Sequence, residues 1–187
     1  KGLDNIPTDK PCIFVANHSS YLDGLVLACI LPKNCRFVAK AELEKSFVPR
    51  VFLSRLETEF VERFDMQKGV TDAHRIAKSA AQWDSLVFFP EGTFYRMPGL
   101  QGFHMGAFIA AVDTGAPVIP LTIRGTRSKL RAHSWFPRRG AVNVVISKPV
   151  LPKGEGWDSA VKLRDEVKQE ILRHCAEPDL AQSTPLL

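Results

Sequence analysis

A histidine and an aspartate five positions apart, His18 and Asp23, are the residues of this sequence best suited to chemistry. A neutral imidazole can take a proton from a hydroxyl group, and a carboxylate on its other ring nitrogen fixes the tautomer that does so. On one continuous helix the two side chains would lie about 140° apart, because each residue turns an α-helix by about 100°. The pair therefore requires His18 in a loop and Asp23 in the first turns of the next helix.

The residues around the pair predict that arrangement. Asn17, Ser19 and Ser20 are typical of turns and helix caps, and an apolar helical pattern starts at Leu22. A strand-like run, Cys12 to Ala16, comes directly before them. The sequence thus places the histidine at the end of a strand.

A second polar segment also follows a strand-like run. Glu91, Gly92 and Thr93 come after Leu86 to Phe89 and a proline. A glycine at such a corner allows backbone amides to approach a ligand closely. We expect amides near Gly92 to be candidate donors to an oxyanion.

Short runs rich in Val, Ile and Phe alternate with helical patterns along the whole chain. The predicted strands are 12–16, 36–39, 59–61, 86–89, 118–123 and 142–147, and the predicted helices are 22–31, 46–54, 71–83, 106–114 and 158–174. We expect Thr71 and Asp158 to cap their helices. The alternation predicts one α/β domain over 1–187, with a mostly parallel mixed sheet flanked by helices and a tail at 178–187. Ligands of such sheets bind at the carboxyl ends of the strands, where both polar segments fall.

Bulk properties exclude several classes of protein. With 187 residues, 45% of them hydrophobic and 24% charged, the chain is neither disordered nor fibrous. The four cysteines show no C-x-x-C spacing, which favours reduced thiols in the cytoplasm. No run approaches the roughly 18 apolar residues of a membrane span, and there is no secretory signal. Because the first residue is Lys1 rather than Met, we expect a domain cut from a longer chain.

The net charge of +5 is unevenly distributed. Arg124 to Arg139 holds six Lys and Arg residues and no acidic one, interleaved with Leu130, Trp135 and Phe136. Cations mixed with aromatic rings suit the surface of an anionic bilayer. A solvated basic loop is the alternative, and nucleic acid fits less well. We expect a cytoplasmic protein that associates peripherally with the membrane.

Four segments, taken in order, resemble the signature blocks of the glycerolipid acyltransferases, the family of the 1-acyl-glycerol-3-phosphate acyltransferases. They are Asn-His-Ser-Ser-Tyr-Leu-Asp at 17–23, Phe-Val-Glu-Arg at 60–63, Phe-Pro-Glu-Gly-Thr at 89–93 and Val-Ile-Pro-Leu at 118–121. Their separations are also similar to those of the family. The resemblance implies a glycerol-phosphate acyltransferase-like fold.

The resemblance also implies an activity in phospholipid biosynthesis. A fatty acyl group would pass from a thioester of coenzyme A or acyl carrier protein to the free hydroxyl of a lysophospholipid, with lysophosphatidate favoured. It implies His18 as the general base and Asp23 as its partner, without an acyl-enzyme or a cofactor. It assigns Arg63 to the acceptor's phosphate, which its planar fork of donors suits. Glu91, Gly92 and Thr93 would also bind the acceptor.

The third block departs from the family pattern. The family usually has an arginine directly after the threonine, whereas here Phe94 and Tyr95 stand between Thr93 and Arg96. Either Arg96 reaches the acceptor from an altered loop or the acceptor headgroup differs.

Two other functions stay open. A thioesterase or lipase-like hydrolase would use water as the acceptor, although the chain lacks a G-x-S-x-G elbow. The other is a non-catalytic lipid-binding domain on the same fold, but the intact His18 and Asp23 argue against it. The histidines and cysteines are scattered without zinc-like spacing, so we expect no metal.

Overall fold

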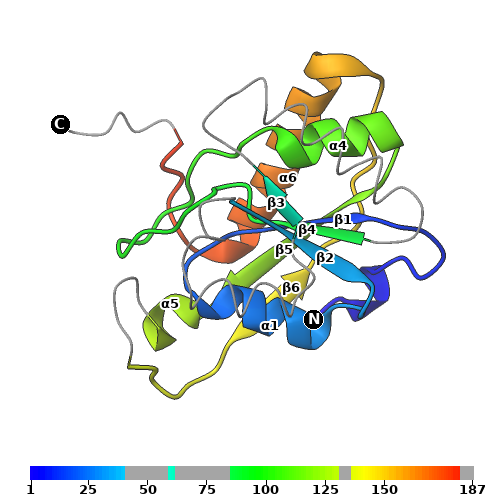
Figure 1. The fold of residues 1–187 in the computed structure, drawn as a ribbon. Helices are drawn as coiled ribbons and strands as arrows, with labels where there is room; N and C mark the ends of the chain where they lie inside the picture. The colour runs from blue at the N-terminus through cyan, green and yellow to red at the C-terminus, as the bar shows by residue number, and fades with distance from the viewer. Residues whose placement is uncertain (41–58, 62–84, 131–135, 182–187) are drawn as a thin grey trace.

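The computed structural model describes residues 1–40, 59–61, 85–130 and 136–181, which are built around a six-stranded sheet (Figure 1). The strands lie in the order β3-β2-β4-β1-β5-β6. They are β1 Ile13–Ala16, β2 Cys35–Lys40, β3 Glu59–Val61, β4 Ser85–Phe88, β5 Val118–Arg124 and β6 Asn143–Ile146. Every strand pair described is parallel except β5 with β6. The predicted α/β fold with a mostly parallel mixed sheet is confirmed.

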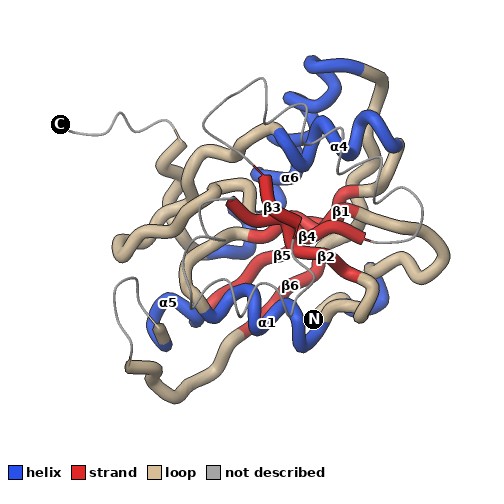
Figure 2. The backbone as a smooth tube through the Cα atoms, viewed as in Figure 1, coloured by secondary structure: helices blue, strands red, loops and turns tan. Residues whose placement is uncertain are grey.

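Helices cover both faces of the sheet (Figure 2). Along β1, Ile13 and Val15 join the core cluster that contains residues of α4 (Gly106–Thr114) and α6 (Gly156–Cys175). Phe14 and Ala16 join the cluster on the other face, with Leu27 of α1 (Leu22–Ile30). Because successive side chains of a strand point to opposite faces, a strand covered on both faces needs apolar residues at every position. The apolar run of β1 meets that requirement.

The predicted elements agree with the structure closely where both can be compared. All six strands are confirmed to within one residue at each end, as are three helices to within two residues. The predicted helices 46–54 and 71–83, with the Thr71 cap, lie outside the described residues. Two short helices, Leu3–Asn5 and α5 (Thr126–Lys129), were not predicted. The Asp158 cap is wrong: Glu155 is the N-cap residue of α6, and Asp158 lies inside the first turn, where a carboxylate favours the helix dipole.

Among the described residues, the loops that follow β4, β1 and β5 leave the sheet at one edge, here called the carboxyl edge. These strands are parallel neighbours and so end side by side. The antiparallel β6 ends at the opposite edge, where Val150 bridges to the first residue of β5, Val118, and α6 begins shortly beyond it. The chain then returns along α6 to the carboxyl edge.

Residues beyond α6 pack against the loop that follows β4. The amide of Leu100 donates to the carbonyl of Pro178 at 2.8 Å, and the amide of Leu180 donates to the carbonyl of Leu100 at 2.9 Å. The first residues of the predicted tail are therefore hydrogen-bonded to the domain. Residues 182–187 lie outside the described part of the chain.

All four cysteines are free thiols. Within the described ranges, no helix has the length and apolar character needed to cross a membrane. In the same ranges, no three His, Cys, Asp or Glu side chains are grouped so that they could hold a metal ion.

Candidate active site

The loop after β1 brings His18 and Asp23 together. Nδ1 of His18 lies 2.9 Å from Oδ2 of Asp23. Asp23 sits in the first turn of α1 and is fully buried, whereas His18 keeps 20% of its side chain exposed. This is the loop-then-helix geometry that the sequence predicted for the pair.

Asp23 is held by three donors on one oxygen. Its Oδ2 accepts hydrogen bonds from the amides of Ser19 at 2.6 Å and Ser20 at 2.8 Å, in addition to the ring of His18. A carboxylate in a first helical turn satisfies amides that have no partner within the helix. Since a carboxylate only accepts, the bond to Nδ1 requires hydrogen on that nitrogen, and in the neutral imidazole the lone pair is then on Nε2.

Two phenylalanines pack against the imidazole of His18. The ring of Phe89 stacks on it with centroids 4.4 Å apart and an interplanar angle of 27°. Phe94 meets it edge-on, with centroids 4.5 Å apart. These contacts restrict rotation of the imidazole, and an aromatic face also stabilises a protonated ring. The ring is positioned before any substrate binds.

Asn17 fixes the point at which the chain leaves β1. Its side-chain amide donates to the carbonyl of Ile123 at 3.0 Å, and its side-chain oxygen accepts from the amide of Ile123 at 2.7 Å. Next to it, the hydroxyl groups of Ser19 and Thr126 are 3.0 Å apart. The sequence indicated only a turn residue at Asn17, because its partner lies 106 positions away on β5.

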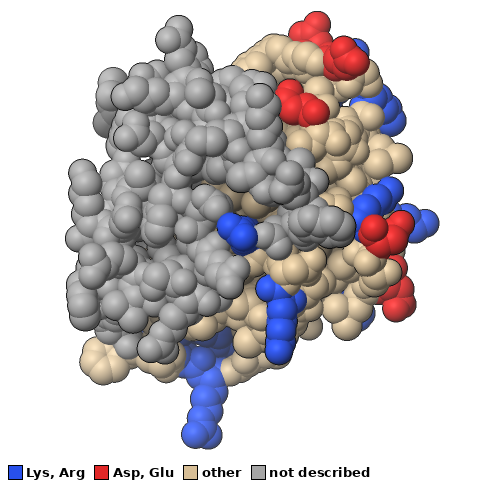
Figure 3. Space-filling model, turned by 45° about the vertical axis from the view of Figure 1, so that its right-hand side comes forward, with Lys and Arg blue, Asp and Glu red and all other residues tan. Residues whose placement is uncertain are grey.

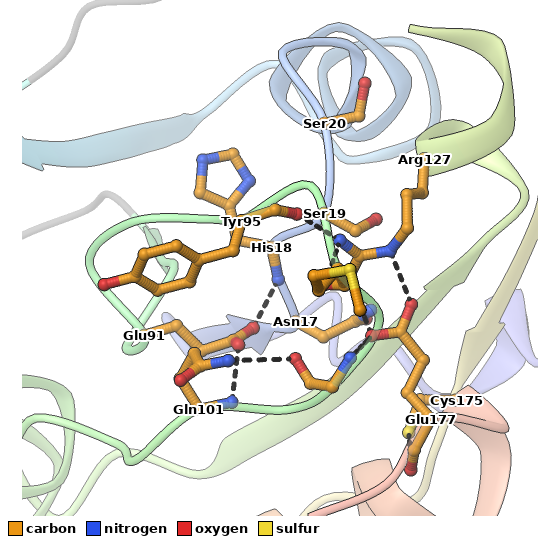
Figure 4. Close-up of polar contacts among 12 residues, drawn as sticks. Asn17, His18, Ser19, Ser20, Glu91, Tyr95, Gln101, Arg127, Cys175 and Glu177 are labelled. Atoms are coloured by element: carbon orange, nitrogen blue, oxygen red, sulfur yellow. Dashed lines mark hydrogen bonds and ion pairs between the residues drawn. The ribbon is translucent and has the colours of Figure 1, made fainter. Parts of the chain in front are cut away.

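Glu91 connects the loop after β4 to the loop after β1. Its Oε1 accepts from the amide of His18 at 2.6 Å and its Oε2 from the amide of Gln101 at 2.8 Å (Figure 4). Burial raises the pKa of this carboxyl to about 7, against the opposing effect of the two amide bonds. Both oxygens are thus engaged within the protein.

The other predicted acceptor residues lie at different places. The amide of Gly92, a residue with φ of 71°, donates to the carbonyl of Phe89 at 3.0 Å, so this amide is engaged within the protein. That other amides near Gly92 serve an oxyanion stays a prediction. Thr93 and Arg96 are exposed on the loop after β4. Arg63 lies outside the described residues.

Comparison with known proteins shows the family of the chain. The family model described as Acyltransferase matches residues 1–124, which contain all four signature segments. The chain belongs to the acyltransferase family. The predicted family is thereby confirmed.

Curated relatives and a solved structure agree with this assignment. An acyltransferase-family protein of Brassica napus, the chloroplastic 1-acyl-sn-glycerol-3-phosphate acyltransferase BAT2, is 34% identical over 91% of this chain and 48% of its own length. LPAT1 of Arabidopsis thaliana, with the same enzyme name, is 32% identical over 80% of this chain and 42% of its own. The crystal structure of PlsC, the 1-acyl-sn-glycerophosphate acyltransferase of Thermotoga maritima, has a TM-score of 0.73 at 28% identity, covering 92% of this chain and 68% of that one. The chain spans about half the length of the curated relatives it matches.

The sheet order explains how three acyltransferase blocks meet. The block at 17–23 follows β1, and the block at 89–93 follows β4, its parallel neighbour. The block at 118–121 lies in β5, on the other side of β1. Segments far apart in the sequence thus come together around His18.

Proposed function

We propose that this acyltransferase moves a fatty acyl group from a thioester to the free hydroxyl of a lysophospholipid, with lysophosphatidate as the favoured acceptor. The observation that carries the proposal is the His18–Asp23 pair at the carboxyl edge, flanked by the third and fourth blocks. The names of the relatives from Brassica napus and Arabidopsis thaliana support it. Coenzyme A and acyl carrier protein are both suitable carriers of the acyl group.

The proposed reaction needs one base and no covalent intermediate. Nε2 of His18 takes the proton of the acceptor hydroxyl as its oxygen attacks the thioester carbonyl carbon. Asp23, bonded to Nδ1, stabilises the imidazolium that forms. The tetrahedral intermediate then collapses, the carbon–sulfur bond breaks, and the leaving sulfur takes the proton from Nε2. The products are an acylated phospholipid and a free thiol.

We assign the acceptor's phosphate to arginines, which bind such groups through two parallel hydrogen bonds. Arg96, exposed on the loop after β4, is one, and Arg63 is the other. Gly92 and Thr93 would complete the acceptor site. Glu91 supports this site through the amides of its neighbours, since both of its oxygens are engaged.

The assay that tests the function measures thiol release by the purified protein from acyl-coenzyme A or acyl carrier protein, with a panel of lysophospholipids. We expect release to depend on the lysophospholipid, and mass spectrometry to find the acylated product. Equal release with water as the sole acceptor would show a thioesterase instead. Binding of donor and acceptor without release would show a non-catalytic lipid-binding domain.

We further propose that the carboxyl edge rests on an anionic membrane surface at the cytoplasmic side. Large apolar side chains are exposed there, among them Tyr95 at 55%, Met97 at 73% and Phe136 at 85%. Arg138 and Arg139 are exposed next to Phe136. Figure 3 shows Lys and Arg side chains projecting from the lower end of the molecule. Exposed aromatic and basic side chains together favour the boundary of an anionic bilayer.

Changing Met97 and Phe136 together to glutamate should weaken binding to vesicles that contain phosphatidylglycerol by at least about tenfold. The change removes two apolar contacts and adds two charges that anionic headgroups repel. Vesicle sedimentation measures the effect. The matched control is Trp157→Glu, because Trp157 is 54% exposed but lies at the opposite edge, at the start of α6. Equal loss of binding in both variants would contradict the proposed orientation.

A further inference from the structure

Arg127, in the short helix after β5, holds the loop after β4 by two carbonyl groups. Its Nη1 donates to the carbonyl oxygen of Tyr95 and to that of Met97, the latter at 2.9 Å. Tyr95 and Met97 are the two neighbours of Arg96 in the sequence. The guanidinium therefore fixes the backbone on both sides of the arginine assigned to the acceptor.

Glu177, just beyond α6, holds Arg127 in turn. Its carboxylate accepts from Nε at 3.0 Å and from Nη2 at 2.7 Å, and its Oε2 also accepts from the amide of Gly99 at 2.8 Å (Figure 4). Both charged side chains are mostly buried, with 15% of Arg127 and 19% of Glu177 exposed. Two parallel bonds between a guanidinium and a carboxylate allow one orientation of the pair. We call this pair, with the carbonyl groups it holds, the Arg127–Glu177 clamp.

The clamped loop also contacts the proposed base. Phe94 precedes Tyr95 and meets the ring of His18 edge-on at 4.5 Å, and it contacts the ring of Tyr21 at 4.8 Å. Phe94 is held by these two rings and not by Arg127, so loosening the hold on Tyr95 and Met97 should displace Arg96 rather than the ring of His18.

Arg127 has little hydrogen-bonding capacity left for a ligand. Four of the five donors that a guanidinium carries are engaged within the protein. Arg96, by contrast, is exposed on a loop, and ordering such a side chain and its backbone on binding costs conformational entropy. A support that orders the loop in advance removes part of that cost.

We propose that the Arg127–Glu177 clamp is a positioning device that presents Arg96 to the phosphate of the acyl acceptor. The inference rests on the proposed acceptor role of Arg96. It gives a physical reason for the altered spacing of the third block: two residues more of loop separate the arginine from Thr93, and the clamp holds that loop from the other side. Arg127 and Glu177 act through the loop and do not touch the substrate.

The test is the Arg127→Lys variant, which keeps the charge but cannot form the fork and both carbonyl bonds at once. We expect KM for lysophosphatidate to rise about tenfold, while KM for acyl-coenzyme A and kcat stay within about twofold. Arg96→Ala should raise the same KM, and adding Arg127→Lys to it should raise KM no further, because both changes act on one contact. If the Arg127→Lys variant does not fold, Glu177→Gln takes its place and should raise the same KM.

A purely structural role would give a different pattern. Lys168→Met is the matched control, since Lys168 forms a partly buried ion pair with Asp179 at 2.6 Å but holds no carbonyl group of the loop. It should lower thermal stability and leave KM for lysophosphatidate unchanged. A rise in KM with Lys168→Met, or additive effects of the Arg96 and Arg127 changes, would overturn the clamp. If Arg96→Ala leaves KM for lysophosphatidate unchanged while transfer still depends on the acceptor, the clamp is disproved but the proposed function stands. If the wild-type protein shows no acceptor-dependent transfer, the proposed function itself is disproved.

Discussion

The His18→Ala variant is expected to transfer acyl groups about 10³-fold more slowly than the wild-type protein, because the acceptor hydroxyl loses the base that takes its proton. The fold should be retained, since Asp23 keeps its bonds to the amides of Ser19 and Ser20 without the imidazole. Initial rates of thiol release, measured with saturating acceptor, give the effect. Thermal unfolding of the same samples checks that the loss is one of catalysis. Unchanged turnover would rule out His18 as the base.

Asp23→Asn separates the charge of the carboxylate from its geometry. One oxygen, Oδ2, takes all three hydrogen bonds, while Oδ1 is buried without a partner among the described residues. An amide can therefore keep the same bonds with its single oxygen, including the one that fixes the tautomer of His18. What it loses is the negative charge that stabilises the imidazolium. We expect a loss of about 10²-fold, smaller than that of His18→Ala, and full wild-type activity would show that the charge plays no part.

The sequence could predict the sheet and the pairing of His18 with Asp23 because both depend on local patterns. β1 is covered on two faces, so its residues form an uninterrupted apolar run that is visible in the sequence. His18 and Asp23 are separated by one turn, and the cap residues between them indicate the change from strand to loop to helix. The four signature blocks, which occur in the order typical of the family, then indicated the family.

Contacts over long sequence separations could not be predicted in the same way. Asn17 has its partner 106 positions away, and Arg127 has its partner 50 positions away. A basic residue in a basic stretch looks like part of a membrane or phosphate surface, whereas Arg127 is committed to a carboxylate and two carbonyl groups. The contacts of Glu91 could not be predicted either, because a carboxylate beside a glycine suggests a ligand site. Only the structure shows that Glu91 is buried between two amides.

Buried carboxylates bind backbone amides in two loops of the site, the one after β1 and the one after β4. Asp23 accepts from the amides of Ser19 and Ser20, Glu91 from those of His18 and Gln101, and Glu177 from that of Gly99. Loops at the carboxyl edge have no ladder partners for these amides, so buried carboxylates take that place. The acidic residues therefore hold the backbone, whereas Nε2 of His18 and the exposed Arg96 are the groups we propose to meet the substrates.

This use of carboxylates makes the stability of the domain depend on pH through Glu91. Burial raises its pKa from the ordinary value of 4.5 to about 7 in the folded protein. Between these two values the unfolded chain has released the proton and the folded protein still holds it. Because the folded state then binds more protons, stability falls as the pH rises through this window and levels off above it.

Glu91→Gln should remove that dependence. From about pH 5 to about pH 7.5, the wild-type protein should lose about 2 kcal/mol of unfolding free energy relative to the variant, as the shift in pKa requires. The variant also gives up one amide bond, since glutamine has a single acceptor oxygen, but that loss is present at both pH values and cancels in the comparison. Urea unfolding at the two pH values measures the difference, and Glu166→Gln, an exposed glutamate of α6, is the control that should behave as the wild type. Parallel pH profiles for the wild type and Glu91→Gln would mean that the buried carboxylate stays ionised, held by the amides of His18 and Gln101 throughout.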